Sequence, residues 1–143
     1  MTTATDVRPL SLYASRVANN LVVSLARKFD VYVQLSLNLD GWQSSPVLSA
    51  YSKGHFTPNW LSDRDELTVP PTLVVEVCSA SESPDKFLQA AAKYLRCGVR
   101  SCWIVVPRLK RVIVVKDCAR EFMHGDVVDS TLDLSLPLHE IFQ

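Results

Sequence analysis

Apolar residues recur at two different spacings along the first third of the chain, and these spacings predict its first elements. Intervals of three and four residues separate Leu10, Tyr13, Val17, Leu21 and Leu25. This is the stripe of an amphipathic helix, so we expect a helix over residues 10–29. From residue 31 to residue 39 apolar and polar side chains alternate strictly. Such alternation is typical of a half-buried strand, and we expect a single strand there.

The middle of the chain contains a turn, a long loop and a strongly apolar segment. Asp40 and Gly41 predict a turn, and a short strand is expected over residues 46–51. Residues 52–70 mix Gly, Pro, Asn, Ser and charged residues, which predicts a long loop. Residues 73–78 are apolar and rich in β-branched side chains around one carboxylate. We expect this segment to be a central strand.

The second half predicts one helix and several strands. Ser83 provides a capping hydroxyl, and Pro84 suits the first helical position, so a helix is expected from there to about Arg96. Gly98 suits the left-handed residue after it. Strands are expected over residues 102–106, 112–115 and 121–128, with a hairpin turn over residues 107–110 and leucines packing onto the sheet from residues 132–142. The order of elements predicts an α/β or α+β domain with a mixed sheet and helices packed on it.

Composition indicates one domain. With 143 residues and 48% apolar residues, the chain has the size of a single core. We expect a polar leader over residues 1–9 and one domain over residues 10–143. No apolar run reaches the roughly 18 residues of a membrane span, and the first residues are unlike a secretory signal. A cytoplasmic protein is expected. The four cysteines include no CxxC pair, so we expect buried thiols rather than disulfides or zinc ligands.

Charge is balanced in total and uneven along the chain. Lys plus Arg and Asp plus Glu both number 15, but residues 86–120 hold nine basic residues and one acid, a local charge of +8. Residues 121–143 hold five acids and no Lys or Arg. The basic segment could bind the phosphates of a nucleic acid, with Arg108, Lys110 and Arg111 at the expected hairpin as its best candidates. Alternatively, these residues pair with the acidic end of the chain.

Glu76 is the residue most indicative of chemistry. A carboxylate within a buried strand is costly unless a cation, hydrogen bonds or a proton stabilises it. One explanation is a ligand for Mg²⁺ or Mn²⁺, which prefer carboxylate oxygens. The other is a structural acid that reaches solvent or pairs with a lysine of the following helix. The three histidines are isolated, and no glycine-rich phosphate loop or dinucleotide motif is present, so no small-molecule cofactor is expected.

Three segments of the chain resemble the signature of the Uma-two family. They are residues 70–79 (PPTLVVEVCS), residues 93–99 (KYLRCGV) and residues 102–107 (CWIVVP). The end of the chain and the expected first helix also resemble the family, so the similarity extends over about residues 10–142. The family consists of bacterial proteins, abundant in cyanobacteria, that are assigned as nucleases. The resemblance implies a restriction-endonuclease-like core, in which helices flank a central mixed sheet.

The resemblance also implies where a nuclease site would lie. Such folds place an acid after a proline on one strand and an acid on the next, which together bind Mg²⁺, and a lysine nearby stabilises the developing phosphate charge. Glu76 matches the second acid and is therefore the implied catalytic and metal-binding residue. The proline matches Pro46, but Val47 follows it and a valine cannot ligate a metal. At three further positions a charged residue of the family is replaced, by Thr72, Ala90 and Val106.

These departures favour a protein that keeps the nuclease scaffold but has lost most of the catalytic set. It would bind nucleic acid, with DNA as the candidate, or another partner without cleaving it. The alternative is an active Mg- or Mn-dependent DNA endonuclease with a rearranged site around Glu76. Substitute groups for that site would come from Asp85, Lys86, Lys93, Asp63 and Asp65. A third hypothesis is a structural module that forms a homodimer.

Overall fold

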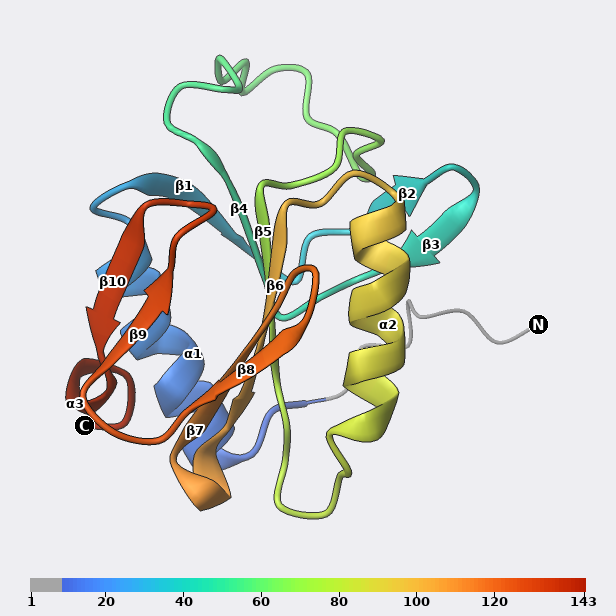
Figure 1. The fold of residues 1–143 in the computed structure, drawn as a ribbon. Coiled ribbons are helices and arrows are strands. Elements are labelled where there is room, and N and C mark those ends of the chain that lie inside the picture. The colour runs from blue at the N-terminus through green and yellow to red at the C-terminus, as the bar shows by residue number, and fades with distance from the viewer. Residues whose placement is uncertain (1–8) are drawn as a thin grey trace.

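The computed structural model describes residues 9–143 and contains a six-stranded sheet with helices on both faces (Figure 1). The expected polar leader lies, except for Pro9, outside the described residues. Across the sheet the strands are ordered β1-β4-β5-β6-β7-β8. Their bounds are β1 Phe29–Val33, β4 Leu48–Ser52, β5 Leu73–Val77, β6 Ser101–Val106, β7 Arg111–Val115 and β8 Ala119–Phe122. β5 and β6 run parallel, and the other neighbours are antiparallel. The expected mixed sheet is confirmed.

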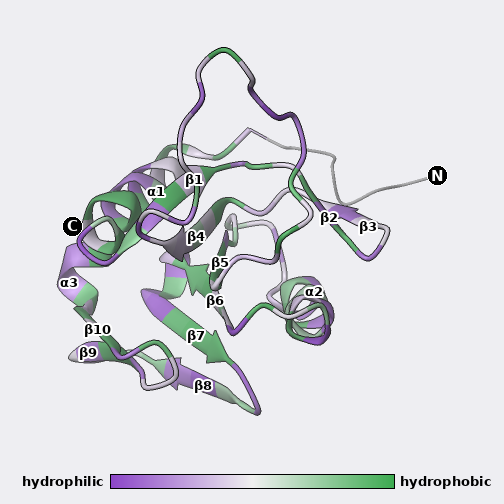
Figure 2. Ribbon diagram, turned by 90° about the horizontal axis from the view of Figure 1, so that it is seen from above, coloured by the Kyte–Doolittle hydropathy of each residue, from purple (hydrophilic) through white to green (hydrophobic). Residues whose placement is uncertain are grey.

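The two faces of the sheet are covered by different elements (Figure 2). On one face lie α1 (Leu12–Leu25), α3 (Leu138–Ile141) and a hairpin of β9 (Asp126–Asp129) and β10 (Leu134–Pro137). On the other face lie α2 (Asp85–Arg96) and a hairpin of β2 (Leu37–Leu39) and β3 (Trp42–Ser44). Each face has its own cluster of buried apolar side chains. Alternate residues of the central strands therefore contribute to two separate cores.

The first helix is shorter than its apolar stripe predicts. Ser11 caps it, because its hydroxyl accepts a hydrogen bond from the Ala14 amide at 3.3 Å. The helix ends at Leu25, and Phe29 is a buried residue of β1 rather than the end of the helix. The expected boundary at residue 29 is thus wrong. An apolar residue at helical spacing can also begin the next strand, and periodicity alone does not separate the two.

The single strand expected over residues 31–39 is two strands in two sheets. Gln34 has a φ of 52° and breaks the extended backbone after Val33. β1 then pairs with β4 in the large sheet, whereas β2 pairs with β3. The turn expected at Asp40 and Gly41 is confirmed, with φ values of 52° and 84° at the two positions. Positive φ at both central residues is what a tight hairpin of this kind requires.

The second half follows most of its local signals. The Ser83 hydroxyl accepts a hydrogen bond from the Asp85 amide at 3.3 Å, but the N-cap of α2 is Pro84, without a side-chain capping bond, and the helix begins at Asp85 rather than at Pro84. Gly98 has a φ of 105° after α2. A short 3-10 helix, η1 (Pro107–Leu109), forms the turn between β6 and β7. The single strand expected over residues 121–128 is wrong. β8 ends at Phe122 and β9 begins at Asp126, with Gly125 at a φ of 66° between them.

Candidate functional site

Glu76 lies where two central strands of the sheet separate. β4 pairs with β5 through Leu48–Ala50 and Leu73–Val75, and Glu76 is the next residue of β5 beyond this ladder. The backbone amide of Val47 donates a hydrogen bond to Glu76 Oε1 at 3.1 Å. The Glu76 side chain is half-buried. Its carboxylate therefore satisfies an amide that the diverging strand would otherwise leave without a ladder partner.

Glu76 faces the side of the sheet that α2 covers, beside Tyr94 and Cys102. Burial, together with the nearby Glu76 carboxylate, raises the pKa of the Cys102 thiol to about 12. The same two causes, in the same order, raise the pKa of the Tyr94 hydroxyl far above its usual range. A thiol and a phenol are protonated at neutral pH even at their ordinary pKa values, and these upward shifts keep them so. The carboxylate thus has a neutral thiol and a neutral phenol beside it, and neither is a usual ligand of Mg²⁺.

Val47 stands at the position matched to the family's first acid, and its side chain points away from Glu76. Val47 is 8% exposed and packs in the apolar cluster on the α1 face. Glu76 alternates along β5 with Val75 and Val77, which belong to that same cluster, so its own side chain lies on the α2 face. Ala90 packs at the margin of the cluster beneath α2. A side chain at position 47 therefore lies across the sheet from Glu76.

The structure gives the two proposed lysines contacts of their own and leaves the three proposed acids exposed. Lys86 Nζ lies 2.6 Å from Glu82 Oε2, and Lys93 Nζ lies 4.7 Å from the centre of the Trp42 ring. Asp85 is exposed in the first turn of α2. Asp63 and Asp65 are exposed in the connection between β4 and β5.

A divalent metal ion at Glu76 would need further oxygen ligands beside this carboxylate. Mg²⁺ needs oxygen ligands in near-ideal octahedral geometry, usually from one or two carboxylates, waters and substrate phosphates. Among residues 9–143, no group of three or more His, Cys, Asp or Glu side chains could hold a metal ion. Of the two carboxylates that the nuclease pattern requires, the matched positions supply Glu76 and a valine that points to the other face. We therefore derive no chemical step through a metal.

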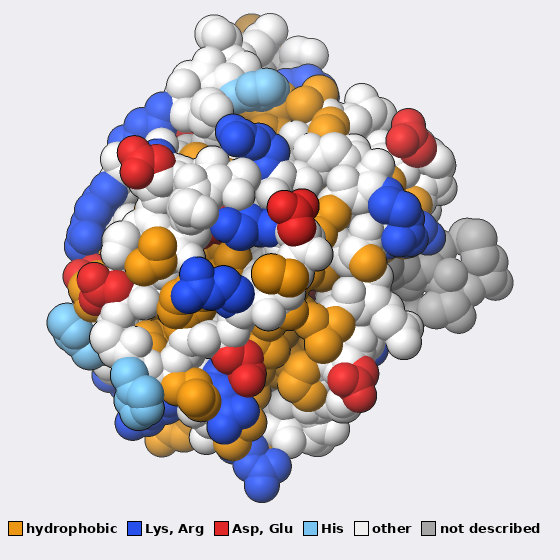
Figure 3. Space-filling view, viewed as in Figure 1, with side chains coloured by type: hydrophobic (Ala, Val, Ile, Leu, Met, Phe, Trp, Pro, Cys, Tyr) orange, Lys and Arg blue, Asp and Glu red, His pale blue; other side chains and the backbone are white. Residues whose placement is uncertain are grey.

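Some residues of the basic segment pair with acids and others are exposed. Pairing with the acidic end of the chain therefore accounts for the first group, and phosphate binding stays a prediction for the second. Arg111 Nη1 lies 3.1 Å from Glu121 Oε2, and Lys116 Nζ lies 3.7 Å from Asp129 Oδ1. Both acids belong to the acidic end of the chain. Arg108 and Lys110 are exposed at the turn between β6 and β7, where Lys110 has a φ of 51°. On the face shown in Figure 3, basic and acidic side chains are interspersed.

A pocket of about 480 Å³ opens at the carboxyl ends of the parallel strands β5 and β6. It is lined by residues of α1, of the segment after β5, of the β6–β7 turn and of the C-terminal segment. Arg108 and Lys110 line it, and so does Arg16 of α1, which sequence reasoning missed. Arg16 lies on the polar face of an amphipathic helix, a position that carries no signal of its own. The sequence therefore identified two of the three cations that meet here.

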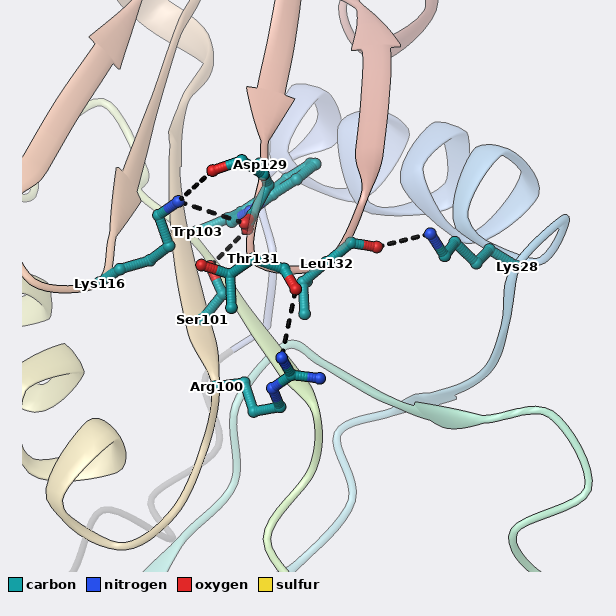
Figure 4. Close-up of polar contacts among 9 residues, drawn as sticks. Lys28, Arg100, Ser101, Trp103, Lys116, Asp129, Thr131 and Leu132 are labelled. Atoms are coloured by element: carbon teal, nitrogen blue, oxygen red, sulfur yellow. Dashed lines mark hydrogen bonds and ion pairs between the residues drawn. The ribbon is translucent and has the colours of Figure 1, made fainter.

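A second buried polar cluster, also missed, surrounds Asp129 of β9 (Figure 4). Asp129 is fully buried, and its Oδ2 accepts hydrogen bonds from Ser101 Oγ at 2.5 Å and Trp103 Nε1 at 2.9 Å. Ser101 and Trp103 belong to β6, so the cluster fastens the β9–β10 hairpin to the central sheet. Nothing in the local sequence around Asp129 distinguishes it from the exposed acids of the same segment.

Comparison with known proteins places this arrangement in a family. The Uma2 family model, described as "Putative restriction endonuclease", matches residues 5–138. The chain belongs to the Uma2 family. The predicted membership in the family is thus confirmed, and the match to the family model covers nearly the whole chain. No curated protein matches the chain.

A solved structure shows the same fold. It is the crystal structure of a putative nuclease belonging to DUF820 from Anabaena variabilis, with a TM-score of 0.74. Sequence identity is 16%, and the match covers 95% of this chain and 83% of the other. At this identity the likeness shows the fold alone. It confirms the expected nuclease-like core for this Uma2 protein.

Within residues 9–143, none of the helices combines the length and hydropathy of a membrane span.

Proposed function

We propose that this Uma2 protein binds the phosphate backbone of a nucleic acid and does not cleave it. The observation that carries the proposal is the contrast between its two groups of charged residues. The Glu76 carboxylate is hydrogen-bonded to the Val47 amide beside the neutral Tyr94 and Cys102. The cations at the β6–β7 turn are exposed. The structure thus favours electrostatic binding over metal-dependent hydrolysis.

The absence of cleavage follows from what metal-dependent hydrolysis requires. The metal positions the attacking water and stabilises the charge that develops on the phosphate. A lysine near the metal adds to that stabilisation, and loss of one such group commonly costs several kcal/mol of transition-state free energy. Here the corresponding positions are Val47 on the α1 face and Ala90 at the margin of the opposite core. The positions matched to the first acid and to the lysine thus hold apolar side chains.

Binding is assigned to Arg16, Arg108 and Lys110. Within residues 9–143, none of these three cations has a side-chain carboxylate within 4.0 Å. Arg108 Nη1 donates to the carbonyl of Ala80 at 3.4 Å, and Arg16 Nε donates to a backbone oxygen of Gln143 at 2.8 Å. Both guanidinium groups keep further N–H donors that could reach phosphate oxygens. Arg111 contributes less, because Glu121 already neutralises it.

The test is fluorescence anisotropy with single-stranded and duplex DNA over a series of salt concentrations. Three phosphate contacts give a slope of log affinity against log salt of about −2.7 for duplex DNA. The variant Arg108→Ala/Lys110→Ala should reduce the steepness of that slope by about two. The matched control Lys53→Ala/Arg96→Ala removes the same charge from exposed positions outside the pocket and should leave the slope unchanged. An equal decrease in the steepness of the slope in both double variants would contradict the assignment of phosphate binding to Arg108 and Lys110.

Cleavage is assayed on the same DNA with Mg²⁺ or Mn²⁺, using Glu76→Gln as the comparison. No cutting by the wild-type protein is expected. Cutting that disappears in Glu76→Gln would overturn the proposal in favour of an active endonuclease with a rearranged site around Glu76. A homodimer and a cytoplasmic location, both expected from the sequence, stay predictions. Light scattering at high concentration and localisation of a tagged protein check them.

A further inference from the structure

The pocket at the carboxyl ends of β5 and β6 has the size and lining of a small-molecule site. Its volume of about 480 Å³ lies within the range of about 300–1,000 Å³ typical of ligand pockets. Its walls are mainly apolar and include the residues Tyr13, Ala14, Val17, Pro107 and Phe142. A pocket with such walls favours a ligand that has an apolar or aromatic body.

Three cations at the same pocket indicate the charge of the ligand. Arg16 comes from α1, and Arg108 and Lys110 come from the β6–β7 turn, so two separate elements supply the positive charge. Of residues 9–143, no Asp or Glu lines the pocket. Guanidinium groups bind phosphate oxygens through two parallel N–H donors. The expected ligand therefore combines a flat or apolar body with a phosphate.

We propose that this pocket binds a nucleoside phosphate, either free or at the end of a nucleic-acid strand. The inference deepens the proposed function and, for the strand-end source, rests on it. The phosphate is held by Arg16, Arg108 and Lys110, and the base lies against the apolar wall. Two aromatic side chains line that wall, Tyr13 from α1 and Phe142 from the C-terminal segment. A base offers each ring a flat partner for stacking, which an alkyl chain does not.

Tyr13 is the residue that best separates this proposal from simple charge attraction. Its side chain is 66% exposed although it belongs to the apolar stripe of α1. Because it contributes little to the core, Tyr13→Ala should leave the fold intact. Stacking on an aromatic side chain is independent of salt-screened charge. Loss of Tyr13 should therefore weaken binding of a nucleotide without changing the salt slope for duplex DNA.

Isothermal titration calorimetry with the whole protein tests the proposal. The ligands are adenosine and thymidine monophosphates, adenosine without phosphate, inorganic phosphate and decanoate as an apolar anion without a ring. We expect both nucleotides to bind more tightly than the other three. Tyr13→Ala should weaken nucleotide binding about fivefold or more, and Arg108→Ala/Lys110→Ala about tenfold or more. The control Lys53→Ala/Arg96→Ala should bind as the wild type does. Decanoate binding as tightly as the nucleotides, or no effect of Tyr13→Ala, would overturn the proposal.

Competition with oligonucleotides distinguishes the two sources of the nucleotide. If the ligand is a strand end, an oligonucleotide with a 5′- or 3′-terminal phosphate should displace the nucleotide more effectively than the same strand without that phosphate. If the ligand is free, the terminal phosphate should have no effect, and the nucleotide should still bind. Duplex binding without any nucleotide binding would refute the inference and leave the proposed function standing. Nucleotide binding without any binding of DNA would refute the proposed function alone.

Discussion

Removal of the Asp129 carboxylate is the sharpest test of how the β9–β10 hairpin is attached to the sheet. Asp129 is completely buried, and so are the Ser101 and Trp103 side chains whose hydroxyl and indole groups donate to its Oδ2. In Asp129→Ala both donors lose their acceptor inside the core. Each unsatisfied buried donor costs about 1–3 kcal/mol, so we expect the free energy of unfolding to fall by about 3–5 kcal/mol.

The other oxygen of Asp129 contributes less to this figure. Lys116 Nζ lies 3.7 Å from Oδ1, and the lysine side chain is 24% exposed, so solvent screens the attraction. Asp129→Asn keeps one acceptor oxygen for the two donors and loses the ion pair. For that variant we expect a smaller loss, of about 1–2 kcal/mol. A typical domain has only about 5–15 kcal/mol of stability in total, so the alanine variant should be visibly destabilised.

Urea unfolding followed by far-UV circular dichroism measures these differences. Asp126→Ala is the matched control, since Asp126 belongs to the same strand but is exposed, and its loss should stay within about 0.5 kcal/mol. A double-mutant cycle with Trp103→Phe should show non-additive losses, because the two side chains share one hydrogen bond. A loss below about 1 kcal/mol for Asp129→Ala, or strict additivity in the cycle, would refute the reasoning.

Three further predictions concern other parts of the molecule. Burial raises the pKa of Cys102 from 9.0 and that of Tyr51 from 10.0 to about 12 each, so both stay protonated when folded while the unfolded chain ionises. Their contribution to stability is complete below pH 9 and should be lost as pH rises from about 9 to 12; urea melts that are flat over this window would contradict it. Gly98→Ala should cost about 1–2 kcal/mol by chemical denaturation, since φ is 105° and a Cβ would lie 3.2 Å from Pro70 Cγ; an unchanged midpoint would show that the turn adapts. Val47→Asp should destabilise the protein by roughly 2 kcal/mol or more and create no Mg²⁺ binding by calorimetry, because the side chain packs on the α1 face; tight binding by the folded variant would disprove that placement.

The elements that could be predicted from sequence are those whose signals are local. α2 has before it a serine whose hydroxyl accepts from the Asp85 amide, and a glycine after it, and both act within a few residues of the helix. β5 and β6 are short apolar runs between polar segments. The break at Gln34 could not be predicted, because a glutamine in a left-handed conformation leaves no compositional mark. It divides an alternating segment whose pattern on its own indicates one strand.

The residues of the candidate site also separate into those with a local sequence signal and those without one. Glu76 was identified because a carboxylate in an apolar strand is unusual, and the turn cations because turns are exposed. Arg16 was missed because only the fold brings α1 beside the β6–β7 turn. Asp129 was missed because its donors lie 26 and 28 residues earlier in the chain. Contacts of this kind depend on which elements become neighbours, and no local pattern of residues records that.

The first helix is fastened to the last part of the chain, and this has a consequence for synthesis. Asn20 donates to the carbonyl of Ile141, and Ser24 donates to Glu140, across separations of 121 and 116 residues. α1 is therefore translated more than a hundred residues before these partners. Its apolar stripe should complete its packing only after the segment around residue 141 has emerged from the ribosome.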